Sequence, residues 1–262
     1  MEIAEHSRRY WQYEYDVASR YIIPLMKQWG VTIDDASILD VGCGEGGGMC
    51  AMADAGARMC GFDIDELRVA LASELMGSRK ILVVSGNMYN ADRPFIGKTF
   101  DIVVLHDVFE HLEDKDETLR RLCEYLAPGG VMLMTFPPYC SAFGAHQQNL
   151  VTPWLRIPFL HLVPFVVSRI LPRIRRESSL TVREVQKLAH LKMGMSQFER
   201  IVSRGNLRVM ALKAYLIGPN HIRFGLKPVS ADMIGRIPVV REFLASGVVY
   251  LLTRYEGAHA GR

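Results

Sequence analysis

The sequence predicts an α/β protein with a doubly wound, mostly parallel, seven-stranded sheet and helices on both faces. Two observations support this prediction. Short apolar runs of strand length alternate with helical segments through the first half of the chain, and the first of these runs enters a glycine-rich turn that opens a helix. The 262 residues, 49% hydrophobic and 23% charged, also have the composition of a globular protein with an ample core.

The elements can be assigned in chain order. The first thirty residues are expected to form an aromatic-rich helix that Gly30 stops. Strands are predicted at 37–41, 58–63, 81–85, 100–105, 131–136, 207–216 and 248–253. Helices are predicted at 46–57, 66–76, 118–126, 181–191 and 196–205, and the last two begin with the capping boxes Thr181/Glu184 and Ser196/Glu199.

The alternation of strands and helices breaks after Pro137, and this break sets the expected domain boundaries. Residues 1–137 are predicted to form a ligand-binding α/β domain that includes the N-terminal helix. Residues 138–195 are irregular, proline-bearing and basic, which predicts a partly helical insertion after the fifth strand. Residues 196–262 are expected to supply helices and strands that complete the sheet.

The net charge of +3 hides an asymmetry between the two parts of the chain. Residues 1–137 carry 13 Lys and Arg against 22 Asp and Glu, whereas residues 138–262 carry 18 against 6. Such a split suggests that the basic part meets an anionic partner or packs against the acidic part. The arginines are scattered and lack interleaved stacking aromatics, so no nucleic-acid partner is expected.

Cysteine usage points to a reducing compartment. The five cysteines form no CxxC pair and lack metal-ligand spacing, so no metal site is expected. The N-terminal sequence MEIAEHSRRYW has no apolar signal segment. Together these features predict a cytoplasmic protein.

The apolar segment from Leu150 to Leu171 requires a membrane test. Its longest run without Lys, Arg, Asp or Glu is about 12 residues, whereas a spanning helix needs roughly 20. The segment is therefore not expected to span. Because Arg173, Arg175 and Arg176 follow it, residues 150–176 either pack over the acidic part of the chain or make a peripheral contact with an anionic membrane surface.

The strongest local signal is the sequence DVGCGEGGG at 40–48. Its five glycines allow the backbone to approach a ligand closely, and the helix that follows presents unpaired N–H groups. The spacing also satisfies G-x-G-x-x-G, so a nicotinamide dinucleotide is an alternative ligand. Asp40 favours S-adenosylmethionine instead, because a carboxylate before the first glycine can accept a hydrogen bond from a ligand ammonium.

Five motifs in order extend this signal: DVGCGEG at 40–46, GFDID at 61–65, GNM at 86–88, FDIVVLHDVFEHLED at 100–114 and LAPGG at 126–130. Together they resemble the class I S-adenosylmethionine-dependent methyltransferases, which have a Rossmann-like fold. The resemblance covers residues 36–137, and residues 138–262 correspond to the region in which such enzymes recognise their acceptors.

The resemblance implies a set of cofactor-binding residues. The glycine turn would line the methionine part of the cofactor with Asp40 near its amino group, Asp63 would bind the ribose hydroxyls, and Ile64 would lie against the adenine. Asn87 stands where the family commonly has Asp, a mild departure because an amide oxygen also accepts a hydrogen bond. The implied turn residues are Gly42, Cys43, Gly44 and Gly46, and the remaining implied contacts are Met88, Leu105 and His106.

Two further groups of residues are candidates for the site. Trp11 and Tyr15 share a helical face and either close over the cofactor or pack onto the sheet. Methyl transfer from a sulfonium is an in-line displacement, so the protein chiefly positions the acceptor, and a base is needed only for a protonated nucleophile. His106 and Asp107 after the fourth strand, and His146 in the loop after the fifth, are the candidate catalytic residues, with His146 as a base or an acceptor orienter.

These observations predict an S-adenosylmethionine-dependent methyltransferase that acts on a small-molecule, lipid or glycan acceptor, with O-methylation as the favoured chemistry. Two alternatives remain open. The chain could be a non-catalytic module that binds S-adenosylmethionine, or an NAD-dependent oxidoreductase.

Overall fold

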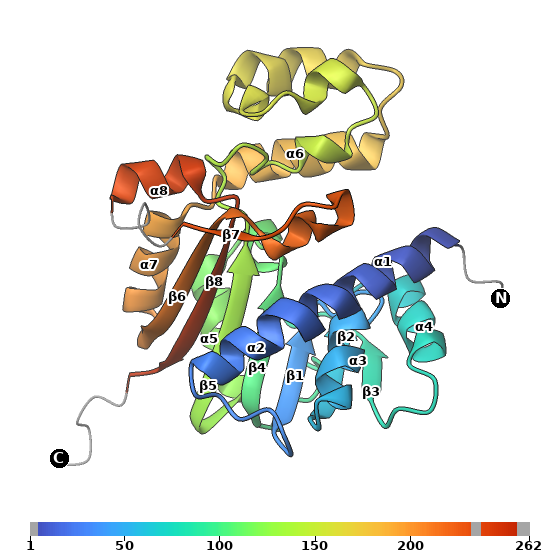
Figure 1. Ribbon diagram of the computed structural model, residues 1–262, viewed down its shortest axis with the longest axis vertical. Helices are drawn as coiled ribbons and strands as arrows, with labels where there is room; N and C mark the ends of the chain where they lie inside the picture. The colour runs from blue at the N-terminus through green and yellow to red at the C-terminus, as the bar shows by residue number, and fades with distance from the viewer. Residues whose placement is uncertain (1–4, 232–236, 256–262) are drawn as a thin grey trace.

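The computed structural model describes residues 5–231 and 237–255 and has one mixed eight-stranded sheet at its centre (Figure 1). The strands are β1 (Ser37–Val41), β2 (Arg58–Asp63), β3 (Leu82–Ser85), β4 (Phe100–His106), β5 (Leu126–Phe136), β6 (Leu207–Ile217), β7 (Val229–Ser230) and β8 (Gly247–Arg254). Their order is β3-β2-β1-β4-β5-β8-β6-β7. The α/β class is confirmed, but the predicted count of seven strands was wrong, because the two-residue β7 adds an edge that no sequence pattern indicated.

The sheet is less uniformly parallel than predicted. The neighbours from β3 to β5 pair in parallel, whereas β8 runs antiparallel to both β5 and β6, and β7 runs antiparallel to β6.

The helices are α1 (Glu5–Val17), α2 (Ile23–Gln28), α3 (Gly47–Asp54), α4 (Glu66–Leu75), α5 (Lys115–Tyr125), α6 (Ser179–Leu191), α7 (Met195–Arg204) and α8 (Pro238–Leu244).

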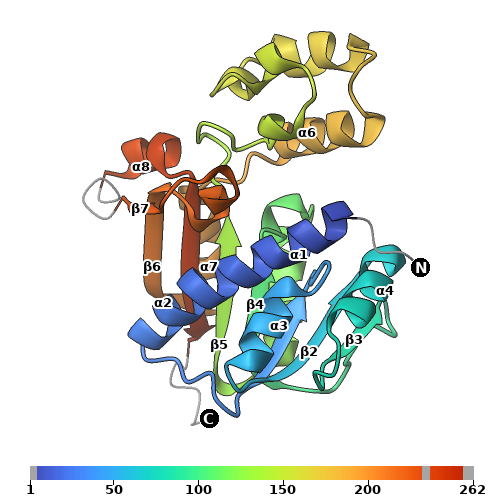
Figure 2. The same ribbon diagram turned by 45° about the vertical axis from the view of Figure 1, so that its right-hand side comes forward.

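Helices cover both faces of the sheet, as expected, and the strand residues alternate between two cores (Figure 2). In β4, Ile102 and Val104 belong to the core shared with α1–α4, whereas Val103 and Leu105 belong to the core shared with α5 and α7. This alternation explains why the central strands read as continuous apolar runs. Because β1, β2, β4 and β5 run parallel, their carboxyl ends lie together at one edge of the sheet, where ligands bind in open α/β sheets.

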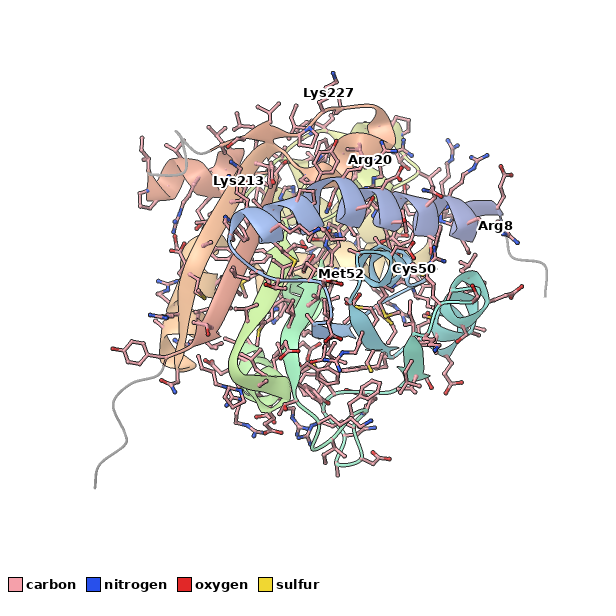
Figure 3. The ribbon with its side chains drawn as sticks, turned by 60° about the horizontal axis from the view of Figure 1, so that its bottom comes forward. Arg8, Arg20, Cys50, Met52, Lys213 and Lys227 are labelled. Atoms are coloured by element: carbon pink, nitrogen blue, oxygen red, sulfur yellow. The ribbon has the colours of Figure 1, made fainter. Side chains whose placement is uncertain are left out.

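The N-terminal helix crosses one face of the sheet. It runs through α1, a π-helical turn and α2, and it ends before Gly30, whose φ of 80° explains the predicted stop. Cys50 and Met52 of α3 lie beneath it and are fully buried (Figure 3). The helix is thereby fixed above the glycine turn.

Residues 137–191, between β5 and α7, have a core of their own. Tyr139, Leu155 and Leu171 pack there against Val185 and Leu188 of α6. The short helical turns of residues 153–173, drawn in yellow, lie above α6 and away from the sheet (Figure 1). Among residues 5–231 and 237–255, no helix is long and apolar enough to cross a membrane.

The two predicted capping boxes were wrong. Ser178 caps α6 by accepting the Leu180 N–H at 3.2 Å, three residues before Thr181. At the start of α7, the N–H groups of Met195 and Ser196 have no acceptor within the helix. They donate at 2.9 and 2.7 Å to the carboxylate of Glu242, which lies in α8. A tertiary contact thus replaces the local cap, and Glu184 and Glu199 are available for other partners.

Candidate active site

The turn between β1 and α3 keeps its backbone close to the edge of the sheet. Gly42 and Gly44 have φ angles of 78° and 54°, left-handed values that favour glycine. A Cβ atom on Gly44 would lie 2.5 Å from Nη2 of Arg68. The Gly42 N–H donates to the Phe62 carbonyl at 2.8 Å and so ties the turn to the end of β2. The backbone angles and the close neighbours therefore favour glycine at both positions.

Two buried aspartates stand at the ends of β1 and β2. Asp63 is 6% exposed, and its carboxylate accepts the N–H groups of Gly44 at 2.9 Å and Asp65 at 3.0 Å. Asp40 is 8% exposed, and burial together with the charge of Asp63 raises its pKa to about 7. Two close carboxyl groups of this kind create a site that favours a cationic ligand.

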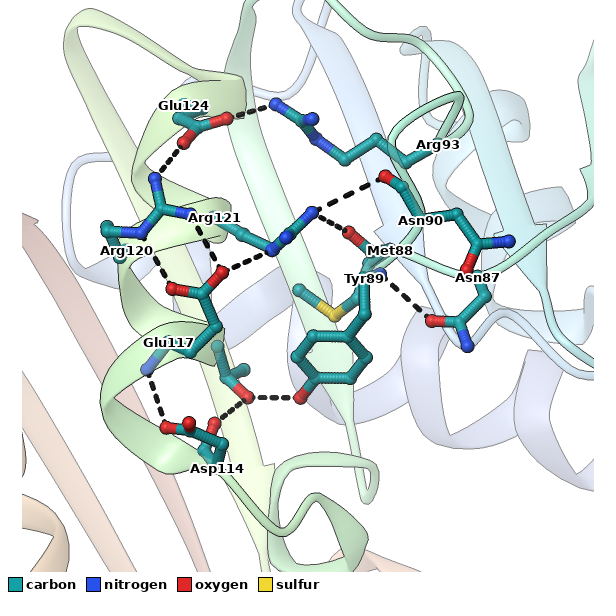
Figure 4. Close-up of polar contacts among 11 residues, drawn as sticks. Asn87, Met88, Tyr89, Asn90, Arg93, Asp114, Glu117, Arg120, Arg121 and Glu124 are labelled. Atoms are coloured by element: carbon teal, nitrogen blue, oxygen red, sulfur yellow. Dashed lines mark hydrogen bonds and ion pairs between the residues drawn. The ribbon is translucent and has the colours of Figure 1, made fainter.

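The loop after β3 is held by a network of polar contacts on α5 (Figure 4). The side-chain oxygen of Asn87 accepts the Tyr89 N–H at 2.9 Å. Arg121 donates to the Met88 carbonyl at 2.9 Å and is itself held by Glu117 at 2.6 Å. Asn87 therefore presents a fixed side-chain amide beside Met88, which is almost fully buried.

A cavity of about 870 Å³ connects these elements with the segments that follow β4 and β5. The predicted residues that line it include both cofactor-binding and catalytic candidates. They are Gly42, Asp63, Ile64, Asn87, Met88, Asp107 and His146.

Other predicted residues lie outside this cavity. His106, Asp40 and Cys43 line a neighbouring cavity of about 40 Å³ together with Glu14. Leu105 is fully buried in the core that faces α5. Gly44 and Gly46 belong to the turn but line neither of these cavities.

The N-terminal helix presents a different pair of aromatic rings from the pair that the sequence suggested. Trp11 and Tyr15 stack with ring centroids 5.4 Å apart, and the Tyr15 hydroxyl donates to Asp54 at 3.0 Å. Tyr10 and Tyr13, which are three residues apart on another helical face, line the cavity. The structure thus places Trp11 and Tyr15 against α3 rather than over the cavity.

Asp107 is fixed at the end of β4 by side chains from distant segments. Its φ is 54°, and its Oδ1 accepts the Thr135 hydroxyl at 2.8 Å. Its Oδ2 accepts the side-chain amide of Asn220 and lies 3.9 Å from Nε2 of His106. The carboxylate is therefore oriented at the point where the two halves of the cavity meet.

His146 belongs to a cluster of ionisable side chains on the other side of the cavity. Its Nδ1 donates to Oε1 of Glu184 at 3.0 Å, and its Nε2 lies 3.9 Å from Oε1 of Glu110. Its ring centroid is 5.3 Å from that of His111. Burial and the neighbouring His146 lower the pKa of His111 to about 4, and burial followed by the charge of Asp107 raises that of Glu110.

Comparison with known families identifies this architecture. Residues 10–185 match a family model described as a methyltransferase domain, which is more than half of the chain. The chain belongs to the methyltransferase family. The resemblance to the S-adenosylmethionine-dependent methyltransferases that the motifs predicted is thereby confirmed, and the NAD-dependent alternative is set aside.

Two relatives and one solved structure illustrate the range of this methyltransferase family. Phosphoethanolamine N-methyltransferase 1 of Triticum aestivum is 32% identical over 113 residues, which are 43% of this chain and 22% of that protein. The ubiquinone biosynthesis O-methyltransferase of Mesorhizobium japonicum is 33% identical over 98 residues, 37% of this chain and 39% of that protein. The match thus spans well under half of either relative.

A structural comparison supports the fold. An S-adenosylmethionine-dependent methyltransferase from Mesorhizobium loti superposes with a TM-score of 0.55 at 16% identity, covering 88% of this chain and 96% of that one. At this identity the likeness establishes the α/β methyltransferase fold alone.

Sequence reasoning missed several residues of the methyltransferase cavity. Asn220, His221 and Arg223 reach it from the segment after β6, and Lys187 reaches it from α6. No sequence motif marks them, because their position depends on how the segment after β6 and residues 137–191 fold back to the end of β4. Tyr10 and Tyr13 had a detectable signal, since their spacing is helical, but choosing this face required knowing where α3 packs.

Proposed function

We propose that this chain transfers a methyl group from S-adenosylmethionine to a hydroxyl group of a partly apolar small-molecule, lipid or glycan acceptor. The single observation that supports this proposal is the continuity of the cavity. One space of about 870 Å³ extends from Asp63 and Asn87 to Asp107 and His146. A cofactor at one end and an acceptor at the other would meet beside Asp107.

The residues at the β1–β2 end fit S-adenosylmethionine. The Asp63 carboxylate suits the two ribose hydroxyls, and the Asn87 amide suits a purine edge. An ammonium group near Asp40 would relieve the effects that raise the pKa of this carboxyl to about 7. When bound, the cofactor supplies an electrophilic methyl group on a sulfonium.

At the other end, the side chains of this chain hold the acceptor and receive its proton. Asp107 keeps its carboxylate oriented through Thr135 and Asn220, and we assign to it the role of the base that accepts the hydroxyl proton. His146, fixed by Glu184, orients the acceptor. His106 contacts Asp107 without lining the large cavity, so its role is to position that carboxylate.

Amine methylation is a second candidate, because carboxylates from several elements line the same cavity. Glu113, Asp114 and Glu184 could attract an amine as its ammonium ion, and Asp107 could accept the proton that the nitrogen must lose before it attacks the methyl group. Lys187 and Arg223 line the same cavity and suit an acidic group on such an acceptor. The relatives include both O- and N-methyltransferases, and the mass and acid–base behaviour of the methylated product distinguish the two reactions.

The decisive experiment incubates the protein and labelled S-adenosylmethionine with fractionated cell extract and identifies the labelled product. The Asp107→Asn variant should lower kcat by about 10²–10⁴-fold, the usual contribution of a general base. Its affinity for S-adenosylhomocysteine should be unchanged. Cofactor binding without turnover on any fraction would favour the non-catalytic module.

We further propose that residues 150–176 make a peripheral contact with an anionic lipid surface. None of them lines the large cavity, and their apolar side chains divide between the core of the insertion and solvent. Arg173, Arg175 and Arg176 of the same segment are exposed to solvent. The exposed large apolar residues, which we call the apolar tip, are Val151, Trp154, Ile157, Phe159, Val163 and Phe165.

A further inference from the structure

Three potential metal ligands converge at one wall of the large cavity. Glu110 and His111 belong to a short helical turn after β4, and His146 follows β5. Their ligand atoms all lie within 4.8 Å of one another. Oε1 of Glu110 is 3.7 Å from Nε2 of His111 and 3.9 Å from Nε2 of His146. These separations are close to the edge of a tetrahedral metal site, about 3.4 Å for bonds of ~2.1 Å.

Glu110 is the group that most clearly requires a partner. Its side chain is 2% exposed, and neither carboxylate oxygen has a hydrogen-bond partner. The nearby Lys115 directs its ammonium to the Phe109 carbonyl instead. A buried carboxylate without hydrogen bonds is costly, so this arrangement calls for a bound cation or a proton.

The orientation of His146 favours a cation. When its Nδ1–H donates to Glu184, the ring nitrogen left to bind a metal is Nε2, which lies 3.9 Å from Oε1 of Glu110. A carboxylate that fixes the far nitrogen of a histidine is the usual outer partner of a metal-binding imidazole.

We propose that Glu110, His111 and His146 bind a divalent transition-metal ion, with Glu184 orienting His146. Two imidazoles and one carboxylate suit Zn²⁺, Co²⁺ or Fe²⁺ better than Mg²⁺ or Ca²⁺, which prefer oxygen ligands. His111 and His146 line the large cavity, so the remaining coordination positions face it. No metal site was expected from the sequence, because the cysteines lack metal-ligand spacing, and His111 and His146 are 35 residues apart.

The role of the ion rests on the proposed function. A metal at this wall would bind the acceptor oxygen and lower the pKa of its hydroxyl, so that Asp107 can accept the proton. His146 then orients the acceptor through the metal.

The test measures metal binding without turnover. Protein freed of metal with a chelator is titrated with Co²⁺ and followed by calorimetry and by the visible absorption of the bound ion. The wild type should bind one equivalent and develop the absorption of a four- or five-coordinate site. Glu110→Gln and His146→Ala should each weaken Co²⁺ binding by about 10–100-fold or more.

Matched controls remove the same residue types from the surface. His190→Ala on α6 and Glu74→Gln on α4, both of which remove exposed side chains, should leave Co²⁺ affinity unchanged. S-adenosylhomocysteine affinity reports separately on the fold and on cofactor binding, since Asp63 stands at the end of β2 and the metal cluster follows β4 and β5. If a cluster variant does not fold, X-ray absorption of the Co²⁺-loaded wild type should still show scattering from two imidazoles.

The proposal is overturned if the wild type does not bind Co²⁺ or if Glu110→Gln and His146→Ala bind it as tightly as the wild type. It is also overturned if the X-ray absorption spectrum of the Co²⁺-loaded wild type shows no imidazole scattering. Tight Co²⁺ binding without methyl transfer would support the metal site and count against the proposed function. The two failures are therefore distinguishable.

Discussion

Asp63 is hydrogen-bonded to the backbone of Gly44 at 2.9 Å, which connects the end of β2 to the glycine turn after β1. The same carboxylate lines the large cavity. One side chain thus holds the turn in place and faces the proposed ribose position, and its removal should affect ligand binding through both contacts.

We expect Asp63→Ala to weaken S-adenosylhomocysteine binding by about 1.5–3 kcal/mol, the range for charge-assisted hydrogen bonds. This corresponds to roughly a 10- to 150-fold increase in Kd by titration calorimetry. Glu66→Gln, which removes an exposed carboxylate from the start of α4, is the control and should bind normally. Unchanged affinity in Asp63→Ala would remove this residue from the site.

Gly44 in the turn and Gly48 in the helix that follows should respond oppositely to alanine. Gly44 has a φ of 54° and Arg68 occupies its Cβ position, so Gly44→Ala should lower the free energy of unfolding by about 1–2 kcal/mol. Gly48 lies in α3 with nothing within 4 Å of a Cβ, so Gly48→Ala should raise it by about 0.5–1 kcal/mol. Denaturant titration measures both, and equal effects would contradict the described geometry.

The raised pKa of Asp40 predicts a pH dependence of stability. The folded protein binds this proton more tightly than the unfolded chain, so the stabilisation from the protonated carboxyl is complete below about pH 4 and is lost as the pH rises through about 7. Asp40→Asn should remove this loss and raise the free energy of unfolding at pH 8 by on the order of 3 kcal/mol.

The same substitution should weaken cofactor binding, because an amide no longer offers a negative charge to an ammonium. Unfolding curves at pH 5 and pH 8, measured without ligand, provide the comparison. A variant whose stability relative to the wild type is the same at both values would show that Asp40 does not titrate in this range.

Because Glu242 of α8 supplies the cap of α7, substitutions at Glu242 and at Ser196 should have unequal effects on stability. Glu242→Ala removes the acceptor for the Met195 and Ser196 N–H groups and should destabilise the protein by about 1–2 kcal/mol. Ser196→Ala should have little effect, although the sequence suggested that Ser196 begins the helix. Thermal unfolding of the two variants decides between the local and the tertiary cap.

Lipid contact predicts a salt-dependent affinity for vesicles. The wild type should co-sediment with vesicles that contain phosphatidylserine and less with neutral ones, because exposed arginines contribute about 1 kcal/mol each near an anionic surface. Replacing Arg173, Arg175 and Arg176 by Gln should reduce this binding, and Trp154→Ser should reduce it at any ionic strength. Equal sedimentation of wild type and variants would argue that residues 150–176 serve another purpose.

The sequence predicted the parts of this protein that depend on local pattern. The strands, the glycine turn and Asp63 carry their signal in short motifs, because backbone approach to a ligand demands glycine and apolar strands are buried on both faces. The sequence did not decide which N-terminal aromatics face the cavity. Tyr10 and Tyr13, like Trp11 and Tyr15, have helical spacing, and only packing on α3 selects the face. Asn220 could not be predicted at all, because it meets Asp107 across 113 residues of chain.

The position of β8 has a consequence for how the molecule is made. β8 lies between β5 and β6, so the residues of β6 have no place on the sheet until Gly247–Arg254 have been synthesised. The first five strands can assemble early in synthesis, but Asn220 reaches Asp107 only after β8 has inserted between β5 and β6. A released chain truncated after residue 246 should therefore resist proteolysis between β1 and β5 while its β6 segment is cleaved.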